Sequence, residues 1–256
     1  MISKTKRKEY LQLTIKLVQK EINKLQKLSR KKYDVRFDKK IKKELKSPVD
    51  KIIEGDIIRV LYRTNINILS EETGIIKAKN KKNIELSWIV DPLDGTANFS
   101  RNLGDSGVSI ALFEKDKPIF GVIGVFPSGD IYYGGETLGS FKQNKRIYVS
   151  KTTKKNSAII CTGFPVRLDF KSKNFDAYIN KLKNYAKVRM LGSAAVSLLH
   201  VANGSADAYF ESDIMIWDIA AGIAILQGAN GYINLKKGRF KNSHILFASN
   251  SKIKKL

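Results

Sequence analysis

The fold and chemistry of this chain are indicated most strongly by residues 88–99, WIVDPLDGTANF. The stretch continues a hydrophobic strand predicted over residues 84–90 and then becomes a cluster of turn-forming residues. Asp91 and Asp94 flank a Pro-Leu pair, so both carboxylates can project into one space beyond the strand. The following Gly95-Thr96 step offers free backbone N–H groups, which can bind phosphate at the start of a turn or helix. Carboxylates beside an anion-binding turn indicate metal-assisted phosphoryl chemistry.

Two more acidic residues belong beside this pair. Glu71 and Glu72 follow a short extended segment, residues 65–70, and can reach the same space. Oxygen ligands without nearby His or Cys favour Mg²⁺, Mn²⁺ or Ca²⁺ over zinc. A single Asp at such a position is more typical of a turn or a helix cap, and only the spacing of the whole set favours a metal site.

The remaining pattern predicts two halves. Apolar residues three and four apart predict amphipathic helices over residues 11–25 and 50–63. Gly and Pro turns then separate predicted antiparallel strands at 108–113, 119–126, 131–133 and 147–149. Later, strands at 158–162 and 206–211 alternate with helices at 175–186, 193–202 and 218–228. We expect an antiparallel half, 1–150, and an alternating half, 151–256, to form one compact catalytic unit.

The chain is strongly basic. Among 256 residues, 47 Lys and Arg oppose 24 Asp and Glu, a net charge of +23, while 43% hydrophobic residues exclude wholesale disorder. Residues 1–51 alone hold 18 basic and 6 acidic residues, a net charge of +12. Such a segment can bind nucleic acid or an anionic membrane. However, 37 of the 47 cations are lysines and no nucleic-acid motif accompanies them, which favours a solvated helix face.

Several classes of protein are disfavoured. The apolar runs are too short to span a bilayer, and the basic start does not lead into a signal-peptide core. Cys161 is the single cysteine, which excludes an internal disulfide, and His200 and His244 lie too far apart to suggest a zinc site. We therefore expect a cytoplasmic protein without a membrane partner.

Residues 88–99 resemble the first signature of the inositol monophosphatase family, and residues 217–222, WDIAAG, resemble its second. Residues 69–72, 163–165, 192–195 and 207–211 also match the family, so the resemblance spans about residues 40–250. It implies a layered αβαβα fold that combines α+β and α/β features. It also implies a Mg²⁺-dependent, lithium-sensitive phosphomonoesterase that is commonly a homodimer.

The resemblance assigns a role to each matching residue. Two or three Mg²⁺ ions would be held by Glu71, Asp91, the backbone carbonyl of Leu93, Asp94 and Asp218. Glu71 and Thr96 would act in catalysis, Thr96 orienting the attacking water with a helix aspartate. Asp94 and the N–H groups of Gly95 and Thr96 would contact the phosphate, while Gly192, Ser193, Ala194 and Glu211 would line the substrate pocket.

The helix aspartate is where this chain departs from the family pattern. Aligning Pro48-Val49 places Ile53 at the aspartate position, whereas the Asp-x-x-x-Glu spacing places Asp50 there, with Glu54 following. We favour Asp50, because the chemistry requires a carboxylate. If Ile53 were the equivalent, the partner of Thr96 and a third metal site would be missing.

Glu211 bears on the substrate. It lies seven residues before Asp218, as does the carboxylate that contacts inositol hydroxyls in the family, and it can accept hydrogen bonds from a polyol. This favours inositol monophosphate or a related sugar phosphate, and the alternative is a surface glutamate at a strand end. Rival activities on the same scaffold are bisphosphate nucleotidase, fructose-1,6-bisphosphatase and histidinol-phosphatase. A different class of function is binding to RNA or a transcription complex, with secondary catalysis.

Overall fold

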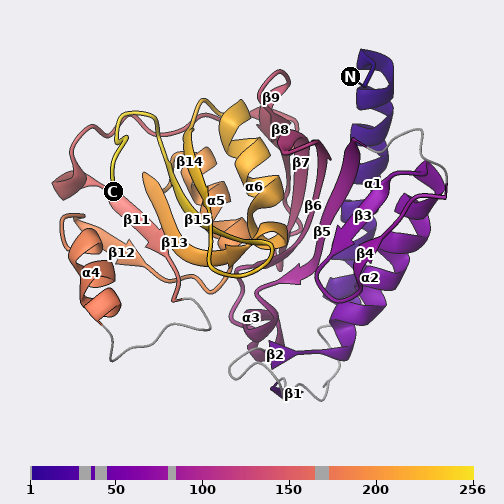
Figure 1. Cartoon of the computed structure of the whole chain (residues 1–256), viewed down its shortest axis with the longest axis horizontal. Coiled ribbons are helices and arrows are strands. Elements are labelled where there is room, and N and C mark those ends of the chain that lie inside the picture. Colours follow the sequence, from indigo (N-terminus) through magenta and orange to yellow (C-terminus); the bar gives the residue numbers. More distant parts are fainter. Residues whose placement is uncertain (1, 29–35, 38–44, 80–84, 165–172) are drawn as a thin grey trace.

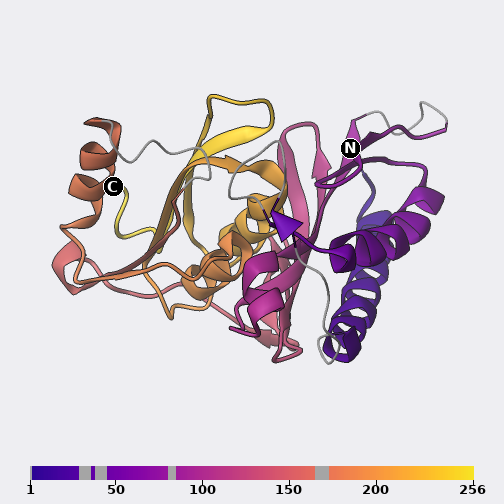
Figure 2. The ribbon, with the colours of Figure 1, turned by 90° about the horizontal axis from the view of Figure 1, so that it is seen from below.

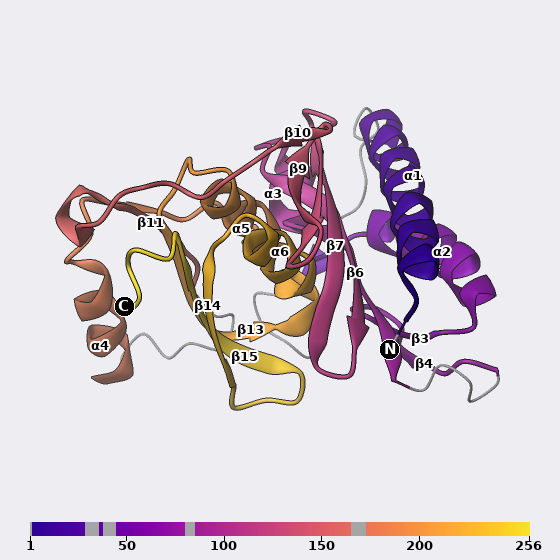
Figure 3. The same cartoon turned by 90° about the horizontal axis from the view of Figure 1, so that it is seen from above.

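Two sheets and three layers of helices alternate through the molecule. The computed structural model describes residues 2–28, 36–37, 45–79, 85–164 and 173–256. Seen from above, α1 and α2 cover one face of a first sheet, α5 and α6 lie between this sheet and a second one, and α4 covers the far side (Figure 3). Figure 2 shows the same order of layers from the opposite direction. The predicted αβαβα fold is confirmed.

The first sheet has eight strands in the order β10-β9-β8-β7-β6-β5-β3-β4. All neighbours are antiparallel except β3 and β5, which are parallel. Their bounds are β3 Asn67–Ser70, β4 Gly74–Ile76, β5 Leu86–Asp94, β6 Ser106–Glu114, β7 Lys117–Phe126, β8 Ile131–Gly135, β9 Gly139–Lys142 and β10 Lys145–Arg146. A separate pair, β1 Arg36–Phe37 and β2 Leu45–Lys46, is antiparallel. The parallel pair matters for function, because it brings the ends of β3 and β5 together.

The outer helices of this half are α1, Lys4–Leu28, and α2, Pro48–Leu61, which is followed by the short 3-10 helix η1, Tyr62–Thr64. The helix α1 buries Val18, Ile22 and Leu25 completely against the sheet. Thus the first part of the basic segment is a layer of the core with its lysines facing outward, in line with the predicted solvated helix face. Ser47 caps α2, and the Asp50 carboxylate closes the capping box by accepting a hydrogen bond from the Ser47 N–H at 2.8 Å.

The second sheet has five strands in the order β12-β11-β13-β15-β14. Its elements are β11 Ile159–Thr162, β12 Lys187–Arg189, β13 Ala208–Met215, β14 Tyr232–Lys237 and β15 Ser243–Ser249, with α4 Lys173–Leu182 on its outer side. The middle layer consists of α5, Ala194–Ala202, and α6, Ile216–Gly228, which lie side by side between the sheets (Figure 1). A Cβ on Gly222 would come within 2.5 Å of the Leu198 Cδ1, so glycine permits this close helix contact.

Some predicted elements need correction. The predicted strand at 147–149 is wrong: Ile147 and Val149 donate single backbone hydrogen bonds to Ser140 and Ala229 and join no ladder. Their alternating apolar pattern serves a segment that crosses between the layers. A short 3-10 helix, η3 Lys155–Ser157, follows near the start of the second predicted half, 151–256. Residue 84 and residues 165–172 lie outside the described ranges. Among the described residues, no helix is long and apolar enough to cross a bilayer.

Candidate active site

The two aspartates of the central motif reach the same face of the first sheet because β5 contains a bulge. Asp91 pairs with Ser109 and Asp94 with Gly107, so three steps along β5 match two steps along β6. In a regular strand, residues three apart point to opposite faces. The extra residue beside Pro92, which has no N–H to donate, restores both carboxylates to one side.

Asp94 is held by the start of helix α5. Its Oδ2 accepts hydrogen bonds from the Ser193 hydroxyl at 2.5 Å and from the Ala195 N–H at 2.7 Å. Ser193 also caps α5, since its oxygen accepts a hydrogen bond from the Val196 N–H. Burial raises the pKa of Asp94 to about 6, and the hydrogen bonds from α5 oppose that rise. Ser193 and Ala194 are themselves buried, so they orient Asp94 more directly than they line an open pocket.

Thr96 lies between the Asp91–Asp94 pair and helix α2. Its hydroxyl lies 3.1 Å from the Asp50 Oδ1 and 3.0 Å from the Leu93 carbonyl oxygen, and its one proton serves one of these acceptors at a time. Gly95 begins the short helix α3, Thr96–Arg101, with a φ of 80°. A Cβ there would lie 2.9 Å from the Asp105 carbonyl oxygen, so both the conformation and the space require glycine.

Of the two candidates for the helix aspartate, the structure places Asp50 against Thr96. Ile53 is completely buried in the apolar core between α2 and the sheet. Burial raises the pKa of Asp50 to about 6, and the carboxylate of Glu72 contributes to the rise.

Glu71 and Asp218 complete the acidic cluster. Glu71 follows β3, and Asp218 lies in the first turn of α6, where its Oδ2 accepts a hydrogen bond from the Met215 N–H at 3.3 Å. The helix begins two residues earlier than predicted, at Ile216. Burial raises the pKa of Glu71 to about 8 and that of Asp218 well above its ordinary value, mainly because the carboxylates lose hydration. Repulsion from neighbouring carboxylates adds to both rises. The pKa of buried Asp91 rises for the same two reasons, and Glu71 is the carboxylate that repels it most.

Glu211 approaches the cluster from the second sheet. It is only 8% exposed, so the alternative of a surface glutamate is wrong. The Tyr209 hydroxyl donates a hydrogen bond to its Oε2 at 2.7 Å. Burial raises the pKa of Glu211 to about 7, and the charge of Asp94 adds to the rise.

The chemistry of this cluster fits a divalent cation. Its donors are oxygens, it contains no His or Cys, and the charges of its carboxylates repel one another. Glu71 and Asp91 shift each other's pKa, so these two carboxylates are near neighbours. In the described part of the chain, no three acidic, His or Cys side chains are close enough to form a closed ligand set. An ion between the carboxylates would therefore have to draw them together.

Three supporting residues were not among the sequence-predicted site residues. Tyr209 orients Glu211, and their spacing of two along β13 was the available signal. Buried Glu54 accepts hydrogen bonds from the Ser70 hydroxyl and from the N–H and hydroxyl of Thr73, which fixes the turn that carries Glu71. The amide of Asn98 donates to the carbonyl of Leu191 at 2.6 Å and so ties α3 to the segment before α5. Beside it, Gly192 has a φ of +75°, and a Cβ there would lie 3.0 Å from the Asn98 Oδ1, so the conformation favours glycine.

Comparisons with known proteins agree with this geometry. The sequence profile of the inositol monophosphatase family matches residues 6–256. The Nus factor SuhB of Xylella fastidiosa is 34% identical over 198 residues, which cover 75% of this chain and 69% of that protein. The structure is similar to the suhB protein of Bartonella henselae, with a TM-score of 0.85, 26% identity and coverage of 96% and 95% of the two chains. It is also similar to inositol monophosphatase from Anabaena, with a TM-score of 0.80, 28% identity and coverage of 96% and 92%. The chain belongs to the inositol monophosphatase family, whose members generally use Mg²⁺.

Proposed function

We propose that this protein is a Mg²⁺-dependent phosphomonoesterase that hydrolyses inositol monophosphate or a related sugar phosphate. The observation that supports it most is the Thr96–Asp50 pair, which stands directly beside the bulge carrying Asp91 and Asp94. The Thr96 hydroxyl, the Asp50 carboxylate that can accept its proton, and carboxylates suited to binding a metal are thus neighbours in one site.

Glu71, Asp91, the Leu93 carbonyl, Asp94 and Asp218 would hold two or three Mg²⁺ ions. When bound, Mg²⁺ lowers the pKa of a coordinated water and neutralises charge on the phosphoryl oxygens. Hydrogen bonds from the starts of α5 and α6 orient the carboxylates of Asp94 and Asp218 toward such ions.

The other residues position the reactants. Thr96, held by Asp50, orients the attacking water, and the Gly95 and Thr96 N–H groups bind the phosphate. Water attacks phosphorus in line and gives up one proton to solvent as the new P–O bond forms, the ester P–O bond breaks, and the leaving alkoxide takes a proton from solvent. No covalent phosphoenzyme forms. The buried Glu211 carboxylate, oriented by Tyr209, accepts hydrogen bonds from hydroxyls of the polyol.

The test is phosphate release from four substrates, each with and without Mg²⁺ and Li⁺. These are myo-inositol 1-phosphate, fructose 1,6-bisphosphate, adenosine 3',5'-bisphosphate and histidinol phosphate. We expect Mg²⁺-dependent, Li⁺-inhibited release that is fastest with inositol phosphate. Preference for a bisphosphate or for histidinol phosphate would replace the substrate assignment, and no release from any of them would overturn the function.

A second candidate is binding to RNA or a transcription complex. It is supported by relatives named as Nus factors and by the exposed lysines of α1. Because α1 is a core layer, its deletion would unfold the protein, so charge reversal at exposed Lys8, Lys16 and Lys27 is the suitable test. Salt-sensitive binding of single-stranded RNA that this variant loses would support the candidate, and no binding at low salt would remove it. We also propose that the protein is a homodimer. Size-exclusion chromatography with light scattering, which gives the mass of the eluting protein, will test this.

A further inference from the structure

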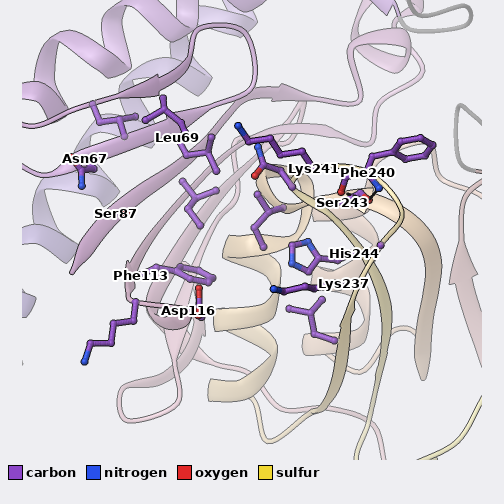
Figure 4. Close-up of a pocket in the computed structure, with 18 of the residues that line it drawn as sticks. Asn67, Leu69, Ser87, Phe113, Asp116, Lys237, Phe240, Lys241, Ser243 and His244 are labelled. Atoms are coloured by element: carbon purple, nitrogen blue, oxygen red, sulfur yellow. Dashed lines mark hydrogen bonds between the residues drawn. The ribbon is translucent and has the colours of Figure 1, made fainter. Parts of the chain in front are cut away.

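We propose that a groove beneath the carboxylate site is a docking site for an acidic, amphipathic helical segment of a protein partner. The groove has a volume of about 1110 Å³ and runs between the β3–β5 side of the first sheet and the β14–β15 hairpin of the second (Figure 4). None of its lining residues is a member of the acidic cluster. The proposal is therefore independent of the phosphatase assignment.

The floor of the groove is apolar and lies on the strands that carry the acidic site. Leu69 and Ile89 line it, and each precedes a cluster carboxylate by two residues, Glu71 and Asp91 respectively. Along β5, residues two apart share a face, so the groove continues down the face that presents Asp91. An occupant of the groove would press on the same strand.

Exposed apolar side chains form its walls. Ile75, Leu235 and Phe240 line the groove while remaining 61%, 38% and 38% exposed. Large apolar side chains gathered in one groove with this exposure are typical of an interaction site.

The rim carries positive charge. Six lysines line the groove against one acidic residue, Asp116: they are Lys77, Lys79, Lys115, Lys236, Lys237 and Lys241. Lys115 pairs with Glu85 at 3.1 Å, and Lys79 lies over the ring of Tyr62. Lys236, Lys237 and Lys241 form no ion pair with any described residue, so the charge of the hairpin side is available to a ligand.

This combination selects the chemistry of the occupant. Single-stranded nucleic acid binds basic grooves by stacking successive bases on exposed aromatic rings. Here the floor is aliphatic and Phe113 is buried, and Arg239 lies over the ring of Phe240, the exposed phenylalanine of the wall. Drug-sized ligands occupy pockets of about 300–1,000 Å³ with a few convergent polar groups, whereas this groove is larger and its polar groups are spread along a rim. A helix about 10–12 Å wide, with one apolar stripe and flanking acids, matches both the floor and the rim.

The test uses fluorescence anisotropy with the full-length protein and a labelled designed peptide. This striped peptide has about 20 residues, with leucines at helical i, i+3, i+4 spacing and glutamates elsewhere. A control peptide, the scrambled peptide, has the same composition in scrambled order. The groove variant is Lys236→Glu with Lys237→Glu. Its matched control is Lys154→Glu with Lys183→Glu, two exposed lysines that do not line the groove. Circular dichroism verifies that both variants are folded.

We expect the striped peptide to bind, the groove variant to weaken binding at least about tenfold, and the control to change it less than about twofold. Leu235→Asp, which leaves the lysines in place, should also weaken binding. Equal affinity for the scrambled peptide, or equal weakening by both charge variants, would overturn the proposal. The proposal would also be overturned if the striped peptide did not bind and single-stranded RNA did, with the RNA binding lost only in the groove variant. That result would assign the groove to nucleic acid.

Discussion

Helix α2 carries two aspartates in opposite environments. Asp56 lies 2.7 Å from the Lys24 Nζ and 3.1 Å from the Arg59 Nη1, and the hydrogen bond from Lys24 holds the pKa of its carboxyl below the ordinary value. Asp50, six residues earlier, is 3% exposed and contacts Ser47 and Thr96 but no described cation. Burial raises its pKa to about 6. One helix thus holds a neutralised aspartate and an uncompensated one.

The difference shows what the acidic cluster lacks. Although the chain has 47 Lys and Arg, no described one forms an ion pair with the six site carboxylates, Asp50, Glu71, Asp91, Asp94, Glu211 and Asp218. Buried carboxylates without a countercharge are costly. Because cations are abundant elsewhere, the missing countercharge supports the proposal that an ion from solution binds at this site.

The largest expected effect comes from removing one cluster charge. Asp94→Asn keeps the size of the side chain but removes a ligand charge, and we expect phosphate release to fall at least about 100-fold. The stability of the metal-free variant should not fall, since repulsion is relieved. Initial rates at saturating Mg²⁺ and a thermal melt measure both. Unchanged turnover would show that the metal assignment is wrong.

The two aspartates of α2 give the next comparison. Asp50→Asn weakens the acceptor that orients Thr96, and we expect a loss of about 10- to 100-fold in kcat. Asp56→Asn is the matched control on the same helix and should change kcat less than about twofold, while costing about 0.5–1 kcal/mol of stability through lost ion pairs. If both variants lost activity equally, the loss would arise from helix α2 and not from the site.

Glu211 should affect substrate choice more than turnover. Glu211→Gln keeps the hydrogen bond from Tyr209 possible but weakens acceptance of polyol hydroxyls, so the KM for inositol monophosphate should rise about 10-fold. The KM for p-nitrophenyl phosphate, which has no polyol, should hardly change. An equal rise for both substrates would exclude a role in recognising the polyol.

The pH dependence of stability should separate the two environments without any mutation. For Asp50, Asp94, Glu211 and Glu71, the folded pKa of about 6 to 8 exceeds the unfolded value, so the native state binds more protons and stability falls as pH rises from about 4 to 8. Asp56 contributes in the opposite direction, since its stabilisation is lost as pH falls through its lowered pKa. Urea unfolding in EDTA should show that the free energy of unfolding declines toward pH 8, and added Mg²⁺ should abolish this decline. A metal-free protein that is more stable at pH 8 than at pH 5 would contradict the raised pKa values.

Much of this could be predicted from the sequence because it depends on local pattern. Many of the strands and helices followed from periodicity and turn residues, the layered αβαβα arrangement followed from the resemblance to the family, and the ends of β5 and β3 indicated where acids gather. The choice between Asp50 and Ile53 could not be made locally, since the two differ in which face of α2 meets Thr96. The segment 147–149 has the pattern of a strand, but its partners belong to different layers. The groove could not be predicted, because two distant sheets form it.

Calorimetric titration of Mg²⁺ into the metal-free protein tests most directly whether the uncompensated carboxylates bind a divalent cation. At pH 7, Glu71 with a pKa of about 8 is mostly protonated, so an ion that binds there must displace protons. We predict saturable binding whose heat changes with the ionisation enthalpy of the buffer, equal to release of about one proton or more, and we predict that Asp94→Asn loses most of it. No saturable binding, or binding without proton release that Asp94→Asn leaves unchanged, would contradict the account.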